Sequence, residues 1–204
     1  MNFDSDFIGG YMIKTISGYF RRIVYKLFDF SDFTKEKNRQ VSFIIDDSFI
    51  DNVENGSFEI IEPLWWAINV YEGEEEYIED LKGFSNEQKF LFAIHRYSAE
   101  VNNGGHDQFF FNSSGIVAED ALEGFRKIGL DENYNILKES MDRLGGKPFK
   151  DRDKRTIQLE ESKALFDDLD DLFYKTDLEE KLRDFIIMNR NQFYFIGTFD
   201  APSY

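Results

Sequence analysis

The chain has 204 residues, no cysteine, and a formal net charge of −16 from 24 Lys and Arg against 40 Asp and Glu residues. Without cysteine, the sequence excludes a disulfide framework, a thiolate zinc site, an iron–sulfur cluster and a cysteine nucleophile. Hydrophobic residues make up 42% and aromatic residues 17% of the chain, which is too apolar for a disordered acidic tail. The negative charge argues against direct nucleic-acid binding, because phosphate recognition needs a basic surface. It favours a basic partner, or it serves solubility.

The first 40 residues differ in charge from the rest. Residues 1–40 hold 7 basic and 5 acidic side chains, a net charge of +2, so the remaining residues carry −18. Apolar residues recur at three- and four-residue steps over residues 8–28, which predicts an amphipathic helix with a basic polar face. Such a helix can lie on an anionic membrane or in a partner's groove. We favour packing against the acidic body of the same chain.

Two domains follow from this division. We expect an N-terminal amphipathic extension and linker over residues 1–40, and an acidic helical domain over residues 41–204. No run of about 18 or more apolar residues occurs, so we expect no transmembrane helix. The first ten residues carry two Asp and no positive charge, unlike a signal peptide, and we therefore expect a cytoplasmic protein.

The pattern over residues 41–204 is mostly helical. Helical spacing of apolar residues, helix-start residues and Gly stops predict a mainly α class, with one compact domain of about six to eight helices and little strand. Ser85 with Gln88 forms a capping box, which starts a helix that Gly104-Gly105 is expected to end. Apolar residues from Ile157 to Phe173 predict one long or two short helices.

A second capping box is expected near the end of the chain. Thr176, followed three residues later by Glu179, has the spacing that starts a helix. The aromatic stretch over residues 191–204 is expected to pack back on the core. Residues 41–58 leave two interpretations open, a short strand or a helix that starts at Asp46-Asp47.

The densest polar motif spans residues 101–115, where amides, His106 and Asp107 lie among glycines and three phenylalanines. His106 and Asp107 could form the acid/base pair of a hydrolase-like enzyme. Adjacent residues rarely face each other on a helix or strand, however, and no G-x-S-x-G nucleophile elbow is present. We favour a structural role, in which the amides satisfy backbone groups in a tight turn between two helices, while Phe109 and either Phe110 or Phe111 fill the core. We therefore expect no catalytic residue.

Metal and cofactor motifs are also missing from the sequence. The second histidine, His95, has no His four residues away, and no HExxH, P-loop or dinucleotide-binding motif occurs. Asp167, Asp168, Asp170 and Asp171 could hold Mg²⁺ or Ca²⁺, but they lack the spacing and central Gly of an EF-hand loop. We expect neither a metal nor a cofactor.

Acidic residues gather in three groups: residues 72–80, residues 167–180, and Asp46, Asp47, Asp51 and Glu54. Like charges at helical spacing destabilise a helix, so local stability does not explain them. A solvated face is one interpretation. The other is DNA mimicry, because carboxylates on successive helical turns lie roughly 5–6 Å apart and can approximate a phosphate track. The candidate phosphate surrogates are Glu74, Glu75, Glu76, Glu79, Asp80, Asp167, Asp168, Asp170 and Asp171.

Several segments resemble a bacterial family long described as a domain of unknown function, which includes a small acidic DNA-mimic protein. They are EVNNGGHDQFFFNSSG, EPLWWAINVYEGEEEYIEDL, QKFLFAIHRYSAE, EDALEGFRKIG and LDDLFY, and the similarity extends over about residues 41–196. The resemblance implies a mostly helical fold, a homodimer and an action on a transcription factor, whose DNA-binding face the mimic occupies. It also assigns a structural family motif, which consists of Asn102, Asn103, Gly104, Gly105, Gln108, Phe109, Phe110 and Asn112.

Four function classes remain open at this stage. The leading hypothesis is a non-enzymatic DNA mimic that blocks the basic face of a DNA-binding protein and binds no nucleic acid itself. The second is an immunity or antagonist protein that neutralises a basic toxin or nuclease. The third is a hydrolase-like enzyme centred on His106 and Asp107. The fourth is a peripheral membrane protein attached through residues 8–28.

Overall fold

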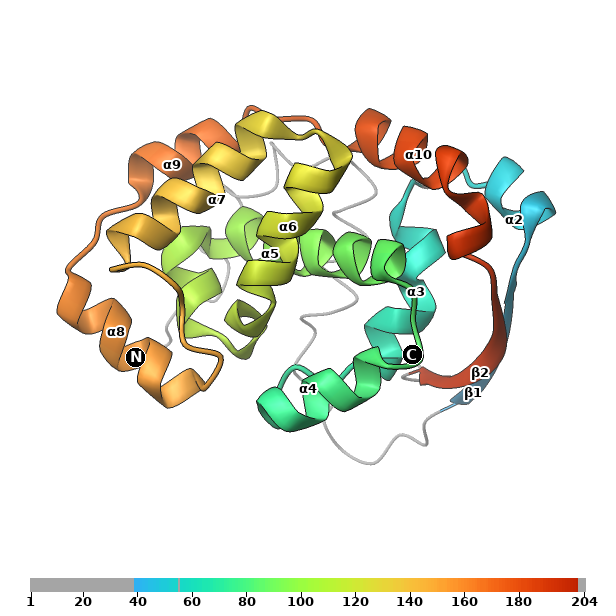
Figure 1. The fold of residues 1–204 in the computed structure, drawn as a ribbon, viewed down its shortest axis with the longest axis horizontal. Coiled ribbons are helices and arrows are strands. Elements are labelled where there is room, and N and C mark those ends of the chain that lie inside the picture. The colour runs from blue at the N-terminus through green and yellow to red at the C-terminus, as the bar shows by residue number, and fades with distance from the viewer. Residues whose placement is uncertain (1–38, 55, 202–204) are drawn as a thin grey trace, which may run out of the picture. The chain divides into compact units, whose positions relative to one another are not determined.

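The computed structural model describes residues 39–54 and 56–201 (Figure 1). These residues belong to one compact unit that spans Asn38–Tyr204. The predicted amphipathic segment, residues 8–28, lies outside the described residues. In the described part, strands (β), α-helices (α) and 3-10 helices (η) occur in this order: β1 (Arg39–Ile45), α2 (Asp47–Asp51), α3 (Phe58–Ala67), α4 (Glu74–Leu81), α5 (Asn86–Phe111), η2 (Ser113–Val117), α6 (Ala118–Ile128), α7 (Asp131–Arg143), α8 (Arg152–Ser162), α9 (Asp167–Phe173), α10 (Glu179–Met188), η3 (Arg190–Gln192) and β2 (Phe195–Ala201).

The mainly α class predicted from the sequence is confirmed. Nine α-helices occur in the described part, one more than the upper expected number, because the five-residue α2 adds to the longer helices. The ambiguous segment after residue 41 contains both a strand and a helix. The strand ends at Ile45, and the carboxylate of Asp46 then accepts a hydrogen bond from Phe49 N at 2.9 Å, which caps α2.

β1 and β2 pair antiparallel, so the aromatic stretch near residue 195 forms a strand beside the first described residues. Side chains alternate between the two faces of this two-stranded sheet, as they must in a strand. Ile45 and Phe199 are buried, whereas the paired Ile44 and Ile196 are 57% and 83% exposed. One face of the sheet therefore joins the core and the other faces solvent.

α5 runs through the middle of the unit and contacts α3, α6, α8 and α9 (Figure 1). It begins with the predicted capping box: Ser85 Oγ accepts from Gln88 N at 3.1 Å, and Gln88 Oε1 accepts from Ser85 N at 2.9 Å. Leu91, Ile94 and Tyr97 are fully buried on this helix. Groups on α5 can therefore link α3, which precedes it in the chain, to α6, α8 and α9, which follow it.

A buried arginine ties the end of α5 to α8. Arg155 is fully buried, and its guanidinium donates to the carbonyl oxygens of Phe110, Asn112, Phe149 and Lys150 at 2.6–2.9 Å. Burial lowers the pKa of Arg155 to about 10, so the group stays charged at neutral pH. The charge needs no carboxylate here because main-chain oxygens surround it, including two near the end of a helix.

Of two sequence predictions about the last helices, one is wrong and the other is settled between its two alternatives. The predicted capping box at Thr176 is wrong. Thr176 Oγ1 donates to Phe173 O, and α10 begins at Glu179 without a side-chain cap. The Glu179 carboxylate instead accepts a hydrogen bond from Ser57, which precedes α3. The stretch from residue 157 to 173 is two short helices, α8 and α9. Ile157 and Leu165 are 54% and 75% exposed, so not all of the apolar residues that suggested these helices reach the core.

Candidate functional site

The polar motif of residues 101–115 lies at a break inside α5. The sequence predicted that the helix ends at Gly104-Gly105, and the structure instead continues it to Phe111 with non-helical angles at both glycines. Gly105 has φ of 75°, which favours glycine, and a Cβ at this position would overlap the carboxylate of Asp170. The break therefore depends on glycine for its backbone angle and for the close approach of α9.

One carboxylate organises the amides of this motif. Glu100 Oε2 accepts from Gln108 Nε2 at 2.8 Å and from Asn112 Nδ2 at 2.9 Å, and its Oε1 accepts from Ser114 Oγ at 2.7 Å. Asn102 instead donates to the Ser98 carbonyl at 2.8 Å. The expectation that the amides satisfy backbone groups therefore holds for Asn102 but not for Gln108 and Asn112. The sequence analysis missed Glu100 as their acceptor.

The motif phenylalanines differ in burial. Phe109 and Phe110 are fully buried, as the sequence predicted, and the Phe109 ring packs edge-on against Tyr97 with centroids 5.0 Å apart. Phe111 is 47% exposed and lies under the guanidinium of Arg152, 5.2 Å from its ring centroid. The first two rings fix the helix break in the core, and the third lies at its surface.

His106 pairs with a distant aspartate and not with its neighbour Asp107. Its ring is fully buried, Nδ1 contacts Asp170 Oδ1, and Nε2 lies 2.7 Å from the hydroxyl of Tyr97. Asp170 Oδ1 also accepts from the His106 backbone N–H at 2.9 Å. The imidazole is thus held between the Tyr97 hydroxyl at one ring nitrogen and the Asp170 carboxylate at the other. Neither ring nitrogen is reached by solvent in this arrangement.

Asp107 projects from the helix onto an exposed surface. Partial burial raises its pKa, and the nearby charges of Asp170 and Asp167 raise it further. The proposed acid/base pair of His106 and Asp107 is therefore not assembled: one group is enclosed in the core and the other lies outside it.

A second buried histidine joins α5 to α3 and α10. His95 Nε2 lies 3.0 Å from Ser57 Oγ. The Ser57 hydroxyl donates a hydrogen bond to Glu179 Oε2 at 2.9 Å, and the Ser57 backbone N–H donates one to Glu179 Oε1 at 2.6 Å. Burial lowers the pKa of His95 to about 4. Burial also raises the pKa of Glu179. The Ser57 hydroxyl is fully buried, so the geometry gives it no access to a substrate.

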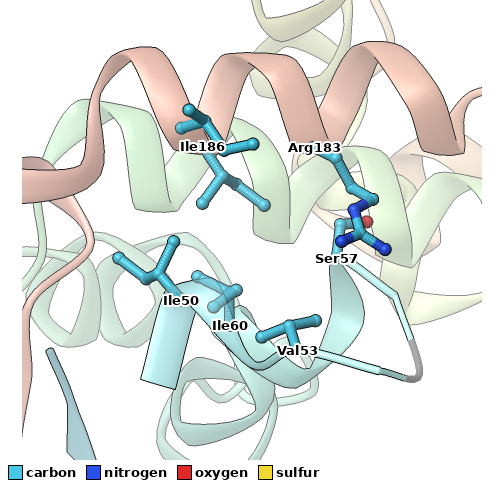
Figure 2. A pocket seen from close by; sticks show the side chains of 7 residues that line it. Ile50, Val53, Ser57, Ile60, Arg183 and Ile186 are labelled. Carbon is cyan, nitrogen blue, oxygen red and sulfur yellow. The ribbon is translucent and has the colours of Figure 1, made fainter. Parts of the chain in front are cut away.

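A small cavity lies beside Ser57 (Figure 2). Its volume of about 20 Å³ gives room for about one water molecule and is far below the space that an organic substrate needs. Figure 2 shows Ser57 and Arg183 together at one end, with Ile50 and Ile186 at the other. The cavity lies between α3 and α10 and is too small to hold an organic substrate.

The acids proposed as phosphate surrogates have different environments on α4. Glu74, Glu75, Glu76 and Glu79 are exposed, and Glu74 lies 3.3 Å from Lys150. Asp80 is half-buried and accepts from Asn69 N at 2.8 Å.

On α9, two of the four nominated acids are committed to internal contacts. Asp168 binds the guanidinium of Arg143 through both oxygens at 2.6 and 2.8 Å, and Asp170 holds His106. Asp167 and Asp171 are exposed and have no hydrogen-bond or ion-pair partner among residues 39–54 and 56–201. Sequence spacing alone could not separate these two roles.

The nominated acids do not gather on one helix or on neighbouring helices. In Figure 1, α4 lies at the bottom of the view and α9 at the upper left, with α5 between them. In the third acidic group, Asp47 and Asp51 both pair with Arg190, at 2.9 and 3.1 Å. The negative charge is therefore distributed around the unit.

A family model described as DMP19-like protein matches residues 82–189. The chain belongs to the DMP19-like family. No curated protein and no solved structure matches the chain. This result confirms the family resemblance seen in the sequence, over a shorter stretch than the expected residues 41–196.

The DMP19-like region contains the polar motif of α5 and its partners. Residues 82–189 include the broken helix α5 with its Glu100 network, the His106–Asp170 contact, and all of α6 to α10. The acids of α4 and both strands lie outside it. Of the two nominated acidic groups, only the one on α9 is part of the region that defines the family.

Two further findings on this DMP19-like chain concern the metal site and the membrane helix considered in the sequence analysis. Among the described residues, no group of three or more His, Cys, Asp or Glu side chains is arranged to hold a metal ion. Within the same residues, the structure has no helix with the length and apolar character needed to cross a membrane.

Proposed function

We propose that this DMP19-like protein is a non-enzymatic, cytoplasmic DNA mimic, which occupies the basic DNA-binding face of a transcription factor or another nucleic-acid-binding protein. One observation carries the proposal: the family region includes α9, on which Asp167 and Asp171 are exposed and unpaired among the described residues. These two acids are four residues apart, so they lie on one face of the helix roughly 5–6 Å apart. That spacing suits two phosphate-like charges.

The internal contacts reduce the set of candidate surrogates. Asp168 neutralises Arg143, and Asp170 is needed inside the unit, so neither is offered freely to a partner. A chain with a net charge of −16 still attracts a basic surface over a distance comparable to the Debye length. We therefore expect fast association that weakens as salt rises, with Asp167 and Asp171 in the contact.

The experiment begins with the full chain immobilised in native bacterial lysate. Bound protein is eluted with salt, identified by mass spectrometry, purified, and tested for whether this chain displaces it from its duplex DNA. Asp167→Asn/Asp171→Asn should lower the affinity about tenfold, because both free charges of α9 are lost. The matched control, Glu75→Gln/Glu76→Gln, removes the same number of charges from α4 and should have a smaller effect.

Three results would contradict the proposal. They are an affinity that does not change with salt, a partner that stays on its DNA at saturating amounts of this chain, and equal losses from the α9 and α4 variants. If the captured protein is a nuclease or toxin whose catalysis is inhibited, the antagonist class replaces the DNA mimic.

A further inference from the structure

One face of α8 carries exposed side chains at the spacing with which helices pair. Lys154, Ile157 and Glu161 are three and four residues apart, so they lie on the same side of the helix. All three are exposed, and Ile157 keeps 54% of its surface in solvent. We call these three residues the α8 stripe. Its central member is a large apolar residue that does not reach the core.

A groove with a volume of about 580 Å³ lies along the stripe, between α8 and the end of α7. Leu144, which is buried, and Phe149, which is 51% exposed, line the groove together with the stripe. Gln158 holds the segment before α8 in place: its Oε1 accepts from Phe149 N at 3.2 Å, and its Nε2 donates to Lys147 O at 3.1 Å. The groove is therefore already formed, and it offers apolar surface from two segments of the chain.

The charges in the groove have a fixed order. Arg143 also lines it, but Asp168 and Glu139 already bind that guanidinium. Lys154 and Glu161 have no ion-pair partner in the described part of the chain. They are seven residues apart, which is about 10 Å along the helix axis. The stripe thus has a free cation at one end, an apolar centre and a free carboxylate at the other end.

These distances fit a second helix better than an extended segment. A helix places residues i and i+7 on one face, roughly 10 Å apart, with the residue at i+3 or i+4 between them. Apolar anchors at this spacing are typical of a helix that docks in a groove. A strand covers about 10 Å in three residues, but it then places the first and last side chains on opposite faces. The occupant that matches both charges and the apolar centre is therefore an amphipathic helix.

Electrostatics favour a helix that belongs to a different protein. The chain carries a net charge of −16, so two copies repel each other during their approach, whereas a net basic protein is attracted. At the groove itself, a helix with basic residues alone would match Glu161 and would be repelled by Lys154. The long-range field therefore selects a basic protein, and the stripe selects a helix that carries an acid at one end and a base at the other.

We propose that the groove between α8 and α7 is a docking site for an amphipathic helix of a net basic partner protein, which places an acid against Lys154, an apolar side chain against Ile157 and a base against Glu161. The apolar contact extends to Phe149, which then also loses its exposure to water. The exposed acids of α9 do not line this groove. The inference therefore goes beyond the proposed DNA mimicry, and either can fail alone.

The experiment uses the full chain and designed helical peptides, with binding measured by fluorescence anisotropy. The first peptide is an alanine-rich helix with Glu at position i, Leu at i+3 and i+4, and Lys at i+7. The second and third peptides are identical except that they carry Lys at both ends or Glu at both ends. Wild type should bind the mixed peptide about tenfold or more tightly than either uniform peptide, because each uniform peptide places like charges together at one end of the stripe.

Charge reversal on the protein should exchange these preferences. Lys154→Glu should bind the peptide with two Lys ends most tightly, and Glu161→Lys the peptide with two Glu ends. The double variant Lys154→Glu/Glu161→Lys restores a mixed order and should bind the mixed peptide like wild type, because the peptide helix can lie in the opposite direction. Ile157→Ser should weaken all three peptides about tenfold, since it removes the apolar centre.

Matched controls make the result specific. Glu160→Lys changes the net charge as Glu161→Lys does but lies one residue away around the helix, and Ile78→Ser removes a similarly exposed apolar side chain from α4. Both controls should bind the peptides like wild type, and circular dichroism should show equal helix content in all variants. Equal binding of the three peptides, reversals that do not exchange the preferences, or equal losses from Ile157→Ser and Ile78→Ser overturn the proposal. So does a groove that a second copy fills, which sedimentation would show as a dimer that Ile157→Ser dissociates.

Discussion

The carboxylate of Asp170 accepts hydrogen bonds from both the backbone N–H and the ring Nδ1 of His106, a residue 64 positions earlier in the chain. It does so at the break of α5, where Gly105 gives it room. An acidic residue that looks like part of a charged surface cluster is thus a structural link between α9 and the centre of the unit. This relationship leads to the first two predictions.

Replacing Asp170 should destabilise the fold. Asp170→Ala removes the acceptor from two donors of a fully buried residue, and we expect a loss of about 2–4 kcal/mol in the free energy of unfolding. Asp171→Ala, on the adjacent exposed position without a partner among the described residues, should change it by less than about 0.5 kcal/mol. Urea unfolding followed by circular dichroism measures both. Equal effects would mean that the His106 contact adds no stability.

Two glycines with positive φ should differ in how well they tolerate a side chain. Gly129 has φ of 78° and ψ of 34°, in the left-handed helical region, and a Cβ on it would have nothing within 4 Å. Gly105 has φ of 75° and ψ of −175°, a region essentially restricted to glycine, and a Cβ on it would overlap Asp170. Gly129→Ala should destabilise by about 1 kcal/mol. Gly105→Ala should cost about 1–3 kcal/mol more, since backbone strain and the overlap with the carboxylate both add to the loss. Thermal unfolding of the two variants side by side tests this, and similar melting temperatures would refute the larger loss at Gly105.

The Glu100 network should depend on its central carboxylate. Glu100→Ala leaves three donors, from Gln108, Asn112 and Ser114, without their acceptor, and we expect a loss of about 2–4 kcal/mol. Glu100→Gln keeps one accepting oxygen but turns an NH₂ group toward donors, so its loss should be intermediate. Chemical unfolding gives the values, with Glu160→Ala as an exposed control. If Glu100→Gln and Glu100→Ala have the same free energy of unfolding as the control Glu160→Ala, the network does not stabilise the fold.

Stability should fall in mild acid because of His95. Its pKa is lowered from 6.5 in the unfolded chain to about 4 in the fold, so the unfolded state binds more protons in this range. The contribution of His95 is complete above about pH 6.5 and declines toward pH 4, by up to about 3 kcal/mol. Glu179 acts in the opposite sense, because its raised pKa makes its contribution decline as pH rises.

The measurement is the urea midpoint at several pH values between 5 and about 7, above the range where most carboxylates titrate. His95→Gln can still donate to Ser57 but does not titrate, so its stability should vary less with pH than that of wild type. Identical pH profiles for the two proteins would show that protonation of His95 does not destabilise the fold.

Local signals in the sequence predicted much of the fold. The capping box at Ser85 and the apolar spacing of α5 follow from interactions within a few residues, and both are confirmed. The capping box predicted at Thr176 failed because a distant residue competes: Glu179 binds Ser57, 122 positions away, in place of its own helix end. Ile157 also departs from the pattern, because helical spacing alone does not show which side of α8 the core covers.

The candidate site was less predictable for the same reason. The motif glycines and amides stand out in the sequence, but their partners do not: Glu100 is an ordinary helical glutamate until Gln108 and Asn112 fold back onto it. Asp168 and Asp170 look equivalent to Asp167 by composition, and only tertiary contacts separate them. Charge patterning indicates where acids are dense, but it does not tell which of them are neutralised internally.

The pairing of β1 with β2 affects how the chain folds while it is being synthesised on the ribosome. Ile45 meets Phe195, so the first described strand must wait until nearly all of the described residues have been synthesised before its main-chain groups find their partners. The helices from α3 to α10 can form and pack during that time, since most of their contacts are closer in sequence. A ribosome stalled before residue 195 would therefore carry a nascent chain with an open strand edge, which is where a holdase chaperone would be expected to bind.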